Sequence, residues 1–438
     1  MPVRKIRYDL QLLTMPTPSL LIVPARFKSG KLYSQLPTSG AGDFTVTRAT
    51  TATRVNASGL IESVASGIPR LDYFSSDGTV GCPALLVEPS GTNFARGVEL
   101  LNTPTPATAA GGVTITTGST DFLAPDGSSG TITKYVGGTA SGSNFIEYVS
   151  STSVSASGVH TFSAFVKAGA TNPLNFCALQ FTAYTAASGT GTSYFNLASG
   201  TALTAGATIQ NYGNGWYRII SAPYTIAADL AGSIRLIFAE GNNDASWPAS
   251  GTLNLTVYAW GIQLEAGSAA TSYIPTTTGS VTRNADVISV SGAVSGSIGQ
   301  TSGTIYAEVD VQSAFLGAIL TIDDGDTSDF ISILRLGNFQ IRARIRRANS
   351  TITSIITSAA VSVGTHKIAL AYTNGDYALY IDGVNAGTST NSTDYPATSL
   401  TQCVLSNTNY VPFNDRILAA ALYTTRLSNA ELAALTSP

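Results

Sequence analysis

The chain has 438 residues, which at about 150 residues per domain predicts two or three domains. Charged residues make up 11% of it, against about 25% in an average soluble protein. The net charge of −3 offers no overall basic field for nucleic acid, and no apolar run reaches the ~18–20 residues of a membrane-spanning helix. Ser, Thr, Gly and Asn take the place of the missing charges, which disfavours long exposed helices and favours short strands joined by turns. We therefore predict an all-β protein that contacts neither nucleic acid nor the membrane interior.

Residues 1–75 are predicted to form an extended N-terminal arm. Alternating apolar residues, Phe44 with Val46 and later Val55 with Leu60, predict short strands within it. The arm has too few apolar side chains to bury a core of its own. We therefore expect another domain or neighbouring chains to hold it, which indicates an assembly.

Residues 76–280 are predicted to form a β-sandwich of the jelly-roll type. Short alternating runs recur between Gly, Ser and Thr turns, with no helical period between them. In the run His160–Lys167, Phe162 and Phe165 are out of phase, which predicts a β-bulge. Trp216 and Trp260 lie within alternating strands and are predicted to be core residues.

Residues 281–438 are predicted to form a second sandwich that ends in a short helix. Asn374-Gly375 lies between two alternating apolar runs, which predicts a hairpin with both turn residues at positive φ, and Asp382-Gly383 turns the chain again. Near the end, Ser428 and Glu431 have the spacing of a capping box, and Leu427 and Leu432 occupy the flanking hydrophobic positions. This pattern predicts a helix over 429–435.

Several segments resemble segments of bacteriophage virion proteins, tail fibres and related appendages. They are 44–56 with 59–62, 83–94, 260–267 with 271–276, and 282–286. In such proteins the middle region resembles a carbohydrate-binding-module jelly roll. Residues 281–438 are similar to a laminin-G-like or concanavalin-type lectin sandwich, whose central hairpin matches 372–383 and whose closing strand and helix match 416–431. The resemblance implies a homo-oligomer, a trimer by analogy with the family.

Signals for catalysis or metal binding are weak. Glycan hydrolysis needs two facing carboxylates, and nothing in the sequence pairs Glu62, Glu88, Glu147 and Glu265. The acidic run 323–329 lacks the spacing of a calcium loop, so we interpret it as a solvated hairpin tip. The two histidines, His160 and His366, have no evident partners for a zinc site or a catalytic triad. We therefore expect no catalytic residue, no metal and no cofactor.

A strictly alternating strand over 339–347 carries the first binding candidate. Arg342, Arg344 and Arg346 are expected on the face opposite the core. Guanidinium groups pair bidentately with carboxylates, so the row could grip an anionic polysaccharide or an acidic partner. The alternative, to which we give more weight, is an ion-pair row that holds the loop 323–329 of this chain or of another subunit.

A polar loop carries the second binding candidate. Trp247 follows Asn242, Asn243 and Asp244, and an exposed aromatic face can stack on the C–H surface of a sugar. A packing lid or a subunit contact is the alternative for a loop tryptophan, and we give it more weight.

These features together favour a non-enzymatic structural protein of a phage virion, a tail fibre or appendage. Residues 1–75 would dock it to other virion proteins, and the sandwiches would face host surface polysaccharide. It would be assembled in the host cytoplasm and exposed on the particle surface. The alternatives are a capsid decoration or cement protein without a ligand, and a glycan depolymerase, which would need paired carboxylates.

Overall fold

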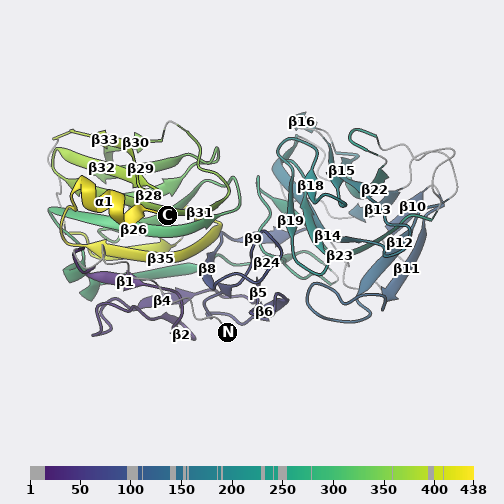
Figure 1. The fold of residues 1–438 in the computed structure, drawn as a ribbon, viewed down its shortest axis with the longest axis horizontal. Helices are drawn as coiled ribbons and strands as arrows, with labels where there is room; N and C mark the ends of the chain where they lie inside the picture. Colours follow the sequence, from purple (N-terminus) through teal and green to yellow (C-terminus); the bar gives the residue numbers. More distant parts are fainter. Residues whose placement is uncertain are drawn as a thin grey trace.

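The computed structural model describes most of the chain and is almost entirely β-sheet, with one short C-terminal helix, α1 (Asn429–Thr436). Two lobes lie side by side (Figure 1). None of the helices in the described part is long and apolar enough to cross a lipid bilayer. The described residues are 15–95, 107–110, 112–138, 145–150, 154, 157–184, 186–188, 191–227, 232–239, 241–244, 254–277, 279–357, 359–392, 399–407 and 409–438.

The C-terminal lobe is a sandwich of two antiparallel sheets, A and B. The strands of sheet A run in the order β33 (Val384–Ser389), β32 (Asp376–Ile381), β31 (Gly364–Thr373), β26 (Ser302–Val311), β35 (Asp415–Tyr423), β8 (Ala84–Val87) and β7 (Leu71–Asp72), with β1 (Leu20–Ile22) also on β35. The strands of sheet B run in the order β2 (Phe27–Lys28), β3 (Lys31–Leu32), β4 (Phe44–Thr47), β25 (Val287–Ser291), β34 (Gln402–Ser406), β27 (Gly317–Asp323), β28 (Phe330–Arg335), β29 (Ile341–Arg347) and β30 (Ser350–Ile356). A short 3-10 helix, η2 (Ala293–Ser297), follows β25.

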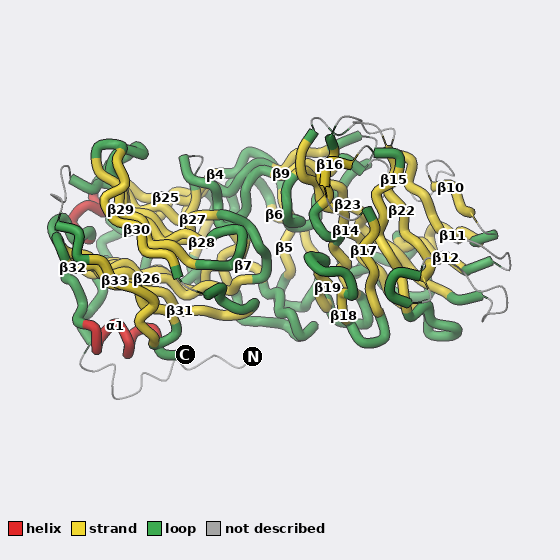
Figure 2. The backbone as a smooth tube through the Cα atoms, turned by 90° about the horizontal axis from the view of Figure 1, so that it is seen from above, coloured by secondary structure: helices red, strands yellow, loops and turns green. Residues whose placement is uncertain are grey.

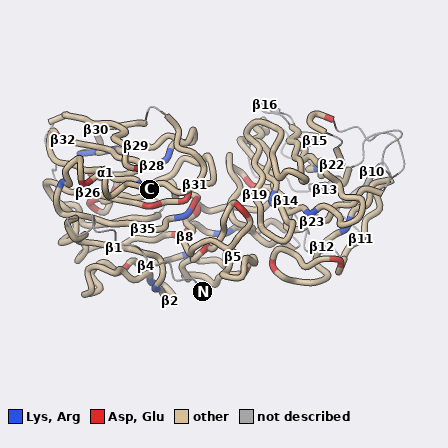
Figure 3. The backbone as a smooth tube through the Cα atoms, in the orientation of Figure 1, with Lys and Arg blue, Asp and Glu red and all other residues tan. Residues whose placement is uncertain are grey.

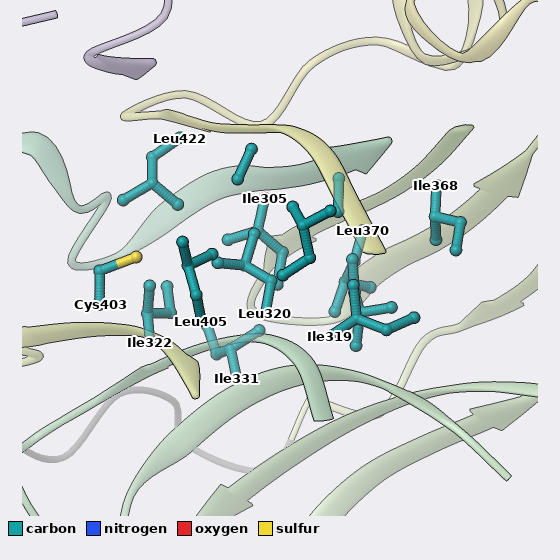
Figure 4. Close-up of a cluster of buried hydrophobic side chains, with 14 of the residues drawn as sticks. Ile305, Ile319, Leu320, Ile322, Ile331, Ile368, Leu370, Cys403, Leu405 and Leu422 are labelled. Carbon is teal, nitrogen blue, oxygen red and sulfur yellow. The ribbon is translucent and has the colours of Figure 1, made fainter. Parts of the chain in front are cut away.

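The core of this lobe lies between the two sheets. Leu370 and Leu422 of sheet A meet Ile319, Ile331 and other aliphatic side chains of sheet B (Figure 4). The helix α1 packs on the outer side of sheet A, so the layers run helix, sheet A, sheet B (Figure 2). The predicted capping box is confirmed, because the Ser428 hydroxyl accepts from the backbone N–H of Glu431 and the Glu431 carboxylate accepts from that of Ser428.

Most of the described part of the expected arm is built into this lobe, whereas its residues 52–64 lie beside the middle lobe. Of the arm's strands, β1 and β7 extend sheet A, and β2, β3 and β4 extend sheet B; β8, which joins β7 to β35, follows the arm. Leu20, Ile22 and Phe44 are fully buried in the shared core. Of the two supports we expected for residues 1–75, another domain of the same chain is the one that 15–75 contact. Their burial therefore no longer calls for a neighbouring subunit.

The middle lobe is a second sandwich of antiparallel sheets, C and D, with an aromatic and aliphatic core between them. Sheet C has the order β10 (Ala107–Ala110), β13 (Phe145–Ser150), β22 (Gly232–Ala239), β15 (Phe176–Thr182), β17 (Thr192–Asn196) and β18 (Thr201–Ala202). Sheet D has the order β11 (Thr114–Ser119), β12 (Ile132–Val136), β23 (Thr256–Ala266), β14 (Gly158–Ala168), β20 (Tyr217–Ile220) and β19 (Thr208–Asn211), with β21 (Tyr224–Ile226) on β14 and β16 (Ala186–Ser188) on β21.

The predicted bulge lies at this pairing, but its extra residue is on the partner strand. Between Ser163 and Phe165 of β14 the register to β23 shifts by one, while β14 itself keeps a regular alternation. The extra residue lies near Gly261, which has a φ of +58°. Without the bulge, Gln263 would face the same core as Ala259; with it, Ile262 and Leu264 face that core instead.

The two predicted turns of the C-terminal lobe form hairpins of different types. Thr373 pairs with Asp376 across Asn374-Gly375, and Ile381 pairs with Val384 across Asp382-Gly383. At the first turn only Gly375 has positive φ, so the expectation for Asn374 is wrong. At the second turn both Asp382 (φ 49°) and Gly383 (φ 82°) are positive, the pattern of a type I′ turn.

The two lobes meet at a junction built from short elements of the N-terminal and linking segments. These are the ribbon of β9 (Gly91–Asn93) with β24 (Val281–Arg283) and the hairpin of β5 (Ala52–Val55) with β6 (Ile61–Val64). The Asn93 amide donates to the carbonyls of Ile262 and Ile274, 3.1 and 2.9 Å away, which fastens β9 to the middle lobe. Charged residues are spread thinly over both lobes, and several lie between them (Figure 3).

A buried ion network occupies this junction. Arg70, which is fully buried, forms ion pairs with Glu88 and Asp286. Arg48 pairs with Asp286 at 2.8 Å, and Arg283 lies 3.4 Å from Glu88. Burial alone would raise the pKa of Glu88, but Arg70 and Arg283 hold it well below its usual range. The network therefore keeps the Glu88 carboxylate ionised, and it joins segments more than 200 residues apart, such as those of Arg48 and Asp286.

Four of the segments singled out in the sequence contribute residues to this network or bond to it. Arg48 comes from 44–56, Glu88 from 83–94, and Arg283 and Asp286 from 282–286. Ser272, from 271–276, donates from its backbone N–H and its hydroxyl to Glu88 at 2.6 and 2.7 Å. These motifs therefore have a structural role at the junction of the two sandwiches.

Candidate functional site

The predicted arginine row lies on the outer face of sheet B. Strand β29 alternates as expected: Ile341, Ala343 and Ile345 are buried between the sheets, and the arginines at 342, 344 and 346 are half-buried on the other side. The strand lies between β28 and β30, so side chains of both neighbours flank the row. We call Arg342, Arg344 and Arg346 the arginine row.

Neutral acceptors hold the arginine row in place. Arg342 Nε donates to Ser354 Oγ at 2.8 Å, and Arg344 donates from Nε and Nη2 to Thr351 Oγ1 at 3.2 and 3.0 Å. Arg346 donates to two backbone carbonyls, those of Thr327 and Asn349, at 3.1 and 3.0 Å. Within the described residues none of the three forms an ion pair with a carboxylate. The Thr327 carbonyl, which accepts from Arg346, belongs to the loop 323–329.

Two aromatic residues support one end of the row. The Arg344 and Arg346 guanidinium carbons lie 5.4 and 6.0 Å from the centre of the Phe330 ring, which suits cation–π attraction. Tyr410 packs edge-on against Phe330 with ring centres 5.5 Å apart, and its hydroxyl donates to the Asp326 carbonyl at 3.2 Å. Burial lowers the pKa of Arg344, and the neighbouring Arg342 and Arg346 lower it further.

The acidic run beside this end forms a hairpin connection, as predicted, but Asp323 and Asp329 at its two ends are buried and not solvated. Asp323 ends β27 and pairs with Phe330 at the start of β28. One oxygen of Asp323 accepts from the Gly325 N–H at 3.0 Å, and the other is buried without a hydrogen-bond partner among the described residues. Burial raises its pKa to about 6, with Asp324 and Asp326 adding to the effect. No cluster of three or more His, Cys, Asp or Glu side chains in the described residues is arranged to hold a metal ion.

The second binding candidate lies in the middle lobe, whereas the arginine row lies in the C-terminal lobe. Asn242 and Asn243 form a tight turn in which Gly241 bridges to Asp244, and Asn243 has a φ of +58°. Burial raises the pKa of Tyr194, and Asp244 adds to this effect. Trp247 lies outside the described residues, so both the sugar role and the packing or subunit role considered for it stay predictions.

His366 has partners that the sequence did not reveal. Its Nδ1 lies 2.6 Å from Asp382 Oδ2, and its Nε2 lies 3.4 Å from Ser362 Oγ, an order that resembles a Ser-His-Asp triad. However, Nε2 is closer to the Ser362 carbonyl, at 2.8 Å. A ring nitrogen that donates to a carbonyl cannot also accept the hydroxyl proton, so this geometry braces the end of β31 and does not activate Ser362.

The other titratable residues considered in the sequence have structural surroundings. His160 Nδ1 lies 2.9 Å from the Gly158 carbonyl, and burial lowers its pKa. Glu265 is buried and accepts from the Thr271 hydroxyl at 2.6 Å, and burial raises its pKa. Trp216 and Trp260 are core residues, as predicted. Glu88 and Glu265 both bond the segment 271–272, a proximity that their separation along the chain conceals.

Comparison with protein families gives a match for one region of the chain. The model of the family described as the concanavalin A-like lectin/glucanases superfamily matches residues 282–433. No curated protein matches the chain.

Solved structures similar to part of the chain include three from different sources. The CBM40 of a Ruminococcus gnavus IT-sialidase is 21% identical over 32% of this chain and 84% of its own, with a TM-score of 0.27. Domain 4 of AbnA, a GH43 extracellular arabinanase from Geobacillus stearothermophilus in complex with arabinotriose, is 16% identical over 39% and 84%, with a TM-score of 0.30. A SAP-like pentraxin from Limulus polyphemus is 11% identical over 30% and 68%, with a TM-score of 0.26. From the family match, residues 282–433 form a concanavalin A-like domain, the lectin-like β-sandwich that carries the arginine row.

Proposed function

We propose that the chain is a non-enzymatic structural protein of a bacteriophage virion, a tail fibre or appendage, that presents lectin-like sandwiches to glycans on the host surface. The observation that carries the proposal is the convergence at the junction. Segments that resemble phage virion proteins lie far apart in the sequence, yet Arg48, Glu88, Arg283 and Asp286 meet in one buried network. The resemblance therefore extends over a single structural unit that joins the two sandwiches.

The concanavalin A-like domain supports the binding part of the proposal. Its sheet A is covered by α1, whereas the β29–β30 part of sheet B exposes polar and charged side chains. A rigid junction would hold this face in a fixed direction relative to the middle lobe. Several copies on one particle would multiply a weak single-site affinity.

Two measurements test this function. Purified protein is mixed with a panel of immobilised neutral and carboxylated polysaccharides, and released reducing ends are assayed in the same tube. Binding without released ends is expected; released ends would contradict the non-enzymatic assignment. Separately, mass spectrometry of purified phage particles from the producing strain is expected to detect the chain, and its absence from such particles would contradict the virion assignment.

A further inference from the structure

We propose that the arginine row is a binding site for a polysaccharide that carries carboxylate groups along its chain, such as a polyuronate. This inference rests on the proposed glycan-binding function and names the class of glycan and the residues that select it.

The spacing of the row suits an extended chain better than a single small ligand. Alternate residues of a strand are about 6.8 Å apart, so the three guanidinium groups span on the order of 14 Å along β29. They lie on one face, and β28 and β30 continue that face on both sides. Ile356, 47% exposed and paired with Arg342, adds an apolar surface at one end.

The charge of the row has no counter-ion within the described part of the chain. Three like charges at alternate positions repel one another, and the contacts that hold them are to hydroxyls and carbonyls. Such an arrangement is costly unless something neutralises it. A carboxylated chain laid along β29 would supply anions at intervals along the row.

The guanidinium groups are also positioned to receive carboxylates. Among the described residues Arg342 donates from Nε alone, which leaves both of its Nη groups for a bidentate contact, and Arg344 retains Nη1. Phe330 lies under Arg344 and Arg346 and limits their motion. This ordering lowers the entropy cost of binding.

The test compares three probes and two matched variants of the full chain by biolayer interferometry. The probes are polygalacturonate, fully methyl-esterified pectin, which has the same backbone without the charges, and dextran sulfate. The first variant replaces Arg342, Arg344 and Arg346 with Gln. The second replaces Arg26, Lys28 and Lys31 with Gln, which removes the same number of positive charges from β2, β3 and the residue before β2, at the opposite edge of sheet B. Thermal unfolding of each variant checks that it is folded.

We expect binding to polygalacturonate, at least tenfold weaker binding to the esterified chain, a loss of tenfold or more in the arginine-row variant, and less than threefold change in the control variant. Arg344→Lys keeps the positive charge but loses the planar guanidinium group that can form two parallel hydrogen bonds to a carboxylate. It should weaken binding several-fold. If the protein binds neutral glycans and the arginine-row variant binds them equally well, this inference is overturned and the proposed function still stands. Equal affinity for dextran sulfate, or an equal loss in the control variant, would indicate unspecific charge attraction and overturn it too. No binding to any glycan would refute both.

Discussion

Arg70 Nη1 and Glu88 Oε2 lie 2.7 Å apart in an ion pair whose two side chains are 0% and 5% exposed. The pair connects the segment before β7 to the end of β8, both at the margin of the C-terminal lobe. Ser272, which follows the last strand of the middle lobe, bonds the same carboxylate. The relative position of the lobes therefore depends on ionised groups that water does not reach.

Replacing Glu88 with Gln should destabilise the protein by about 3–5 kcal/mol, because it leaves Arg70 and Arg283 buried with less compensating charge. The free energy of unfolding from urea titration measures this loss. Glu62→Gln is the matched control: Glu62 pairs with Arg54 on the surface hairpin β5–β6, so its loss should cost about 1 kcal/mol or less. Equal effects of the two substitutions would contradict the role assigned to the buried network.

The lowered pKa of Glu88 leads to a prediction of how the stability of the protein depends on pH. Because the pKa of Glu88 is held below its ordinary value of 4.5, the native state binds fewer protons than the unfolded state around that pH. Its contribution is present above about pH 4.5 and is lost as the pH falls further. The difference between wild type and Glu88→Gln should therefore shrink in acid, and a difference that grows there would contradict this account.

Gly261→Ala should destabilise the middle lobe by about 1–3 kcal/mol through backbone strain alone. Gly261 has a φ of +58°, and an added Cβ would lie 2.9 Å from Phe165 Cδ2. Thermal unfolding compared with Gly241→Ala, where a Cβ meets nothing within 4 Å, separates the strain from a general effect of glycine loss. An unchanged midpoint in Gly261→Ala would show that the bulge tolerates a side chain.

Features set by neighbouring residues could be predicted from the sequence. Local spacing predicts four features that the structure confirms. They are the hairpins around Asn374 and Asp382, the helix cap at Ser428 and the alternation of β29. The error at Asn374 has the same origin: the sequence locates a two-residue turn, but either turn type closes the hairpin, so the φ of its first residue depends on the strands that it joins.

Features set by distant partners could not be predicted. β8 pairs with β35, more than 300 residues away, and no local pattern encodes that contact. In the sequence nothing distinguishes Arg70 and Asp286 from ordinary surface charges, but both are buried in the folded protein. His366 and Ser362 are close in sequence, but the contribution of Asp382 depends on the β31–β32 register. The arginine row was predictable because its three residues alternate within one strand. Tyr410, which packs against Phe330 beside the row, belongs to a separate loop and was not predictable.

Ser362 should not react with a fluorophosphonate probe, because His366 Nε2 lies closer to the Ser362 carbonyl than to its hydroxyl. The measurement is labelling of the wild-type protein, with Ser362→Ala as the control for the site. Labelling of Ser362 that disappears in His366→Ala would contradict the structural role and would reopen a hydrolytic function.

Asp323→Asn should stabilise the protein at pH 8 by about 1–2 kcal/mol, a value discounted for residual solvent screening. Burial raises the pKa of Asp323 from 3.8 to about 6, so the native state binds more protons than the unfolded state between these values. Stability from this residue is therefore greatest below pH 3.8 and is lost as the pH rises through 6. Asparagine removes the charge at every pH, so its advantage should appear above pH 6 and vanish near pH 4. Urea unfolding across that range measures both limits, and a loss of stability at pH 8 would show that the Asp323 carboxylate has a favourable partner in solution.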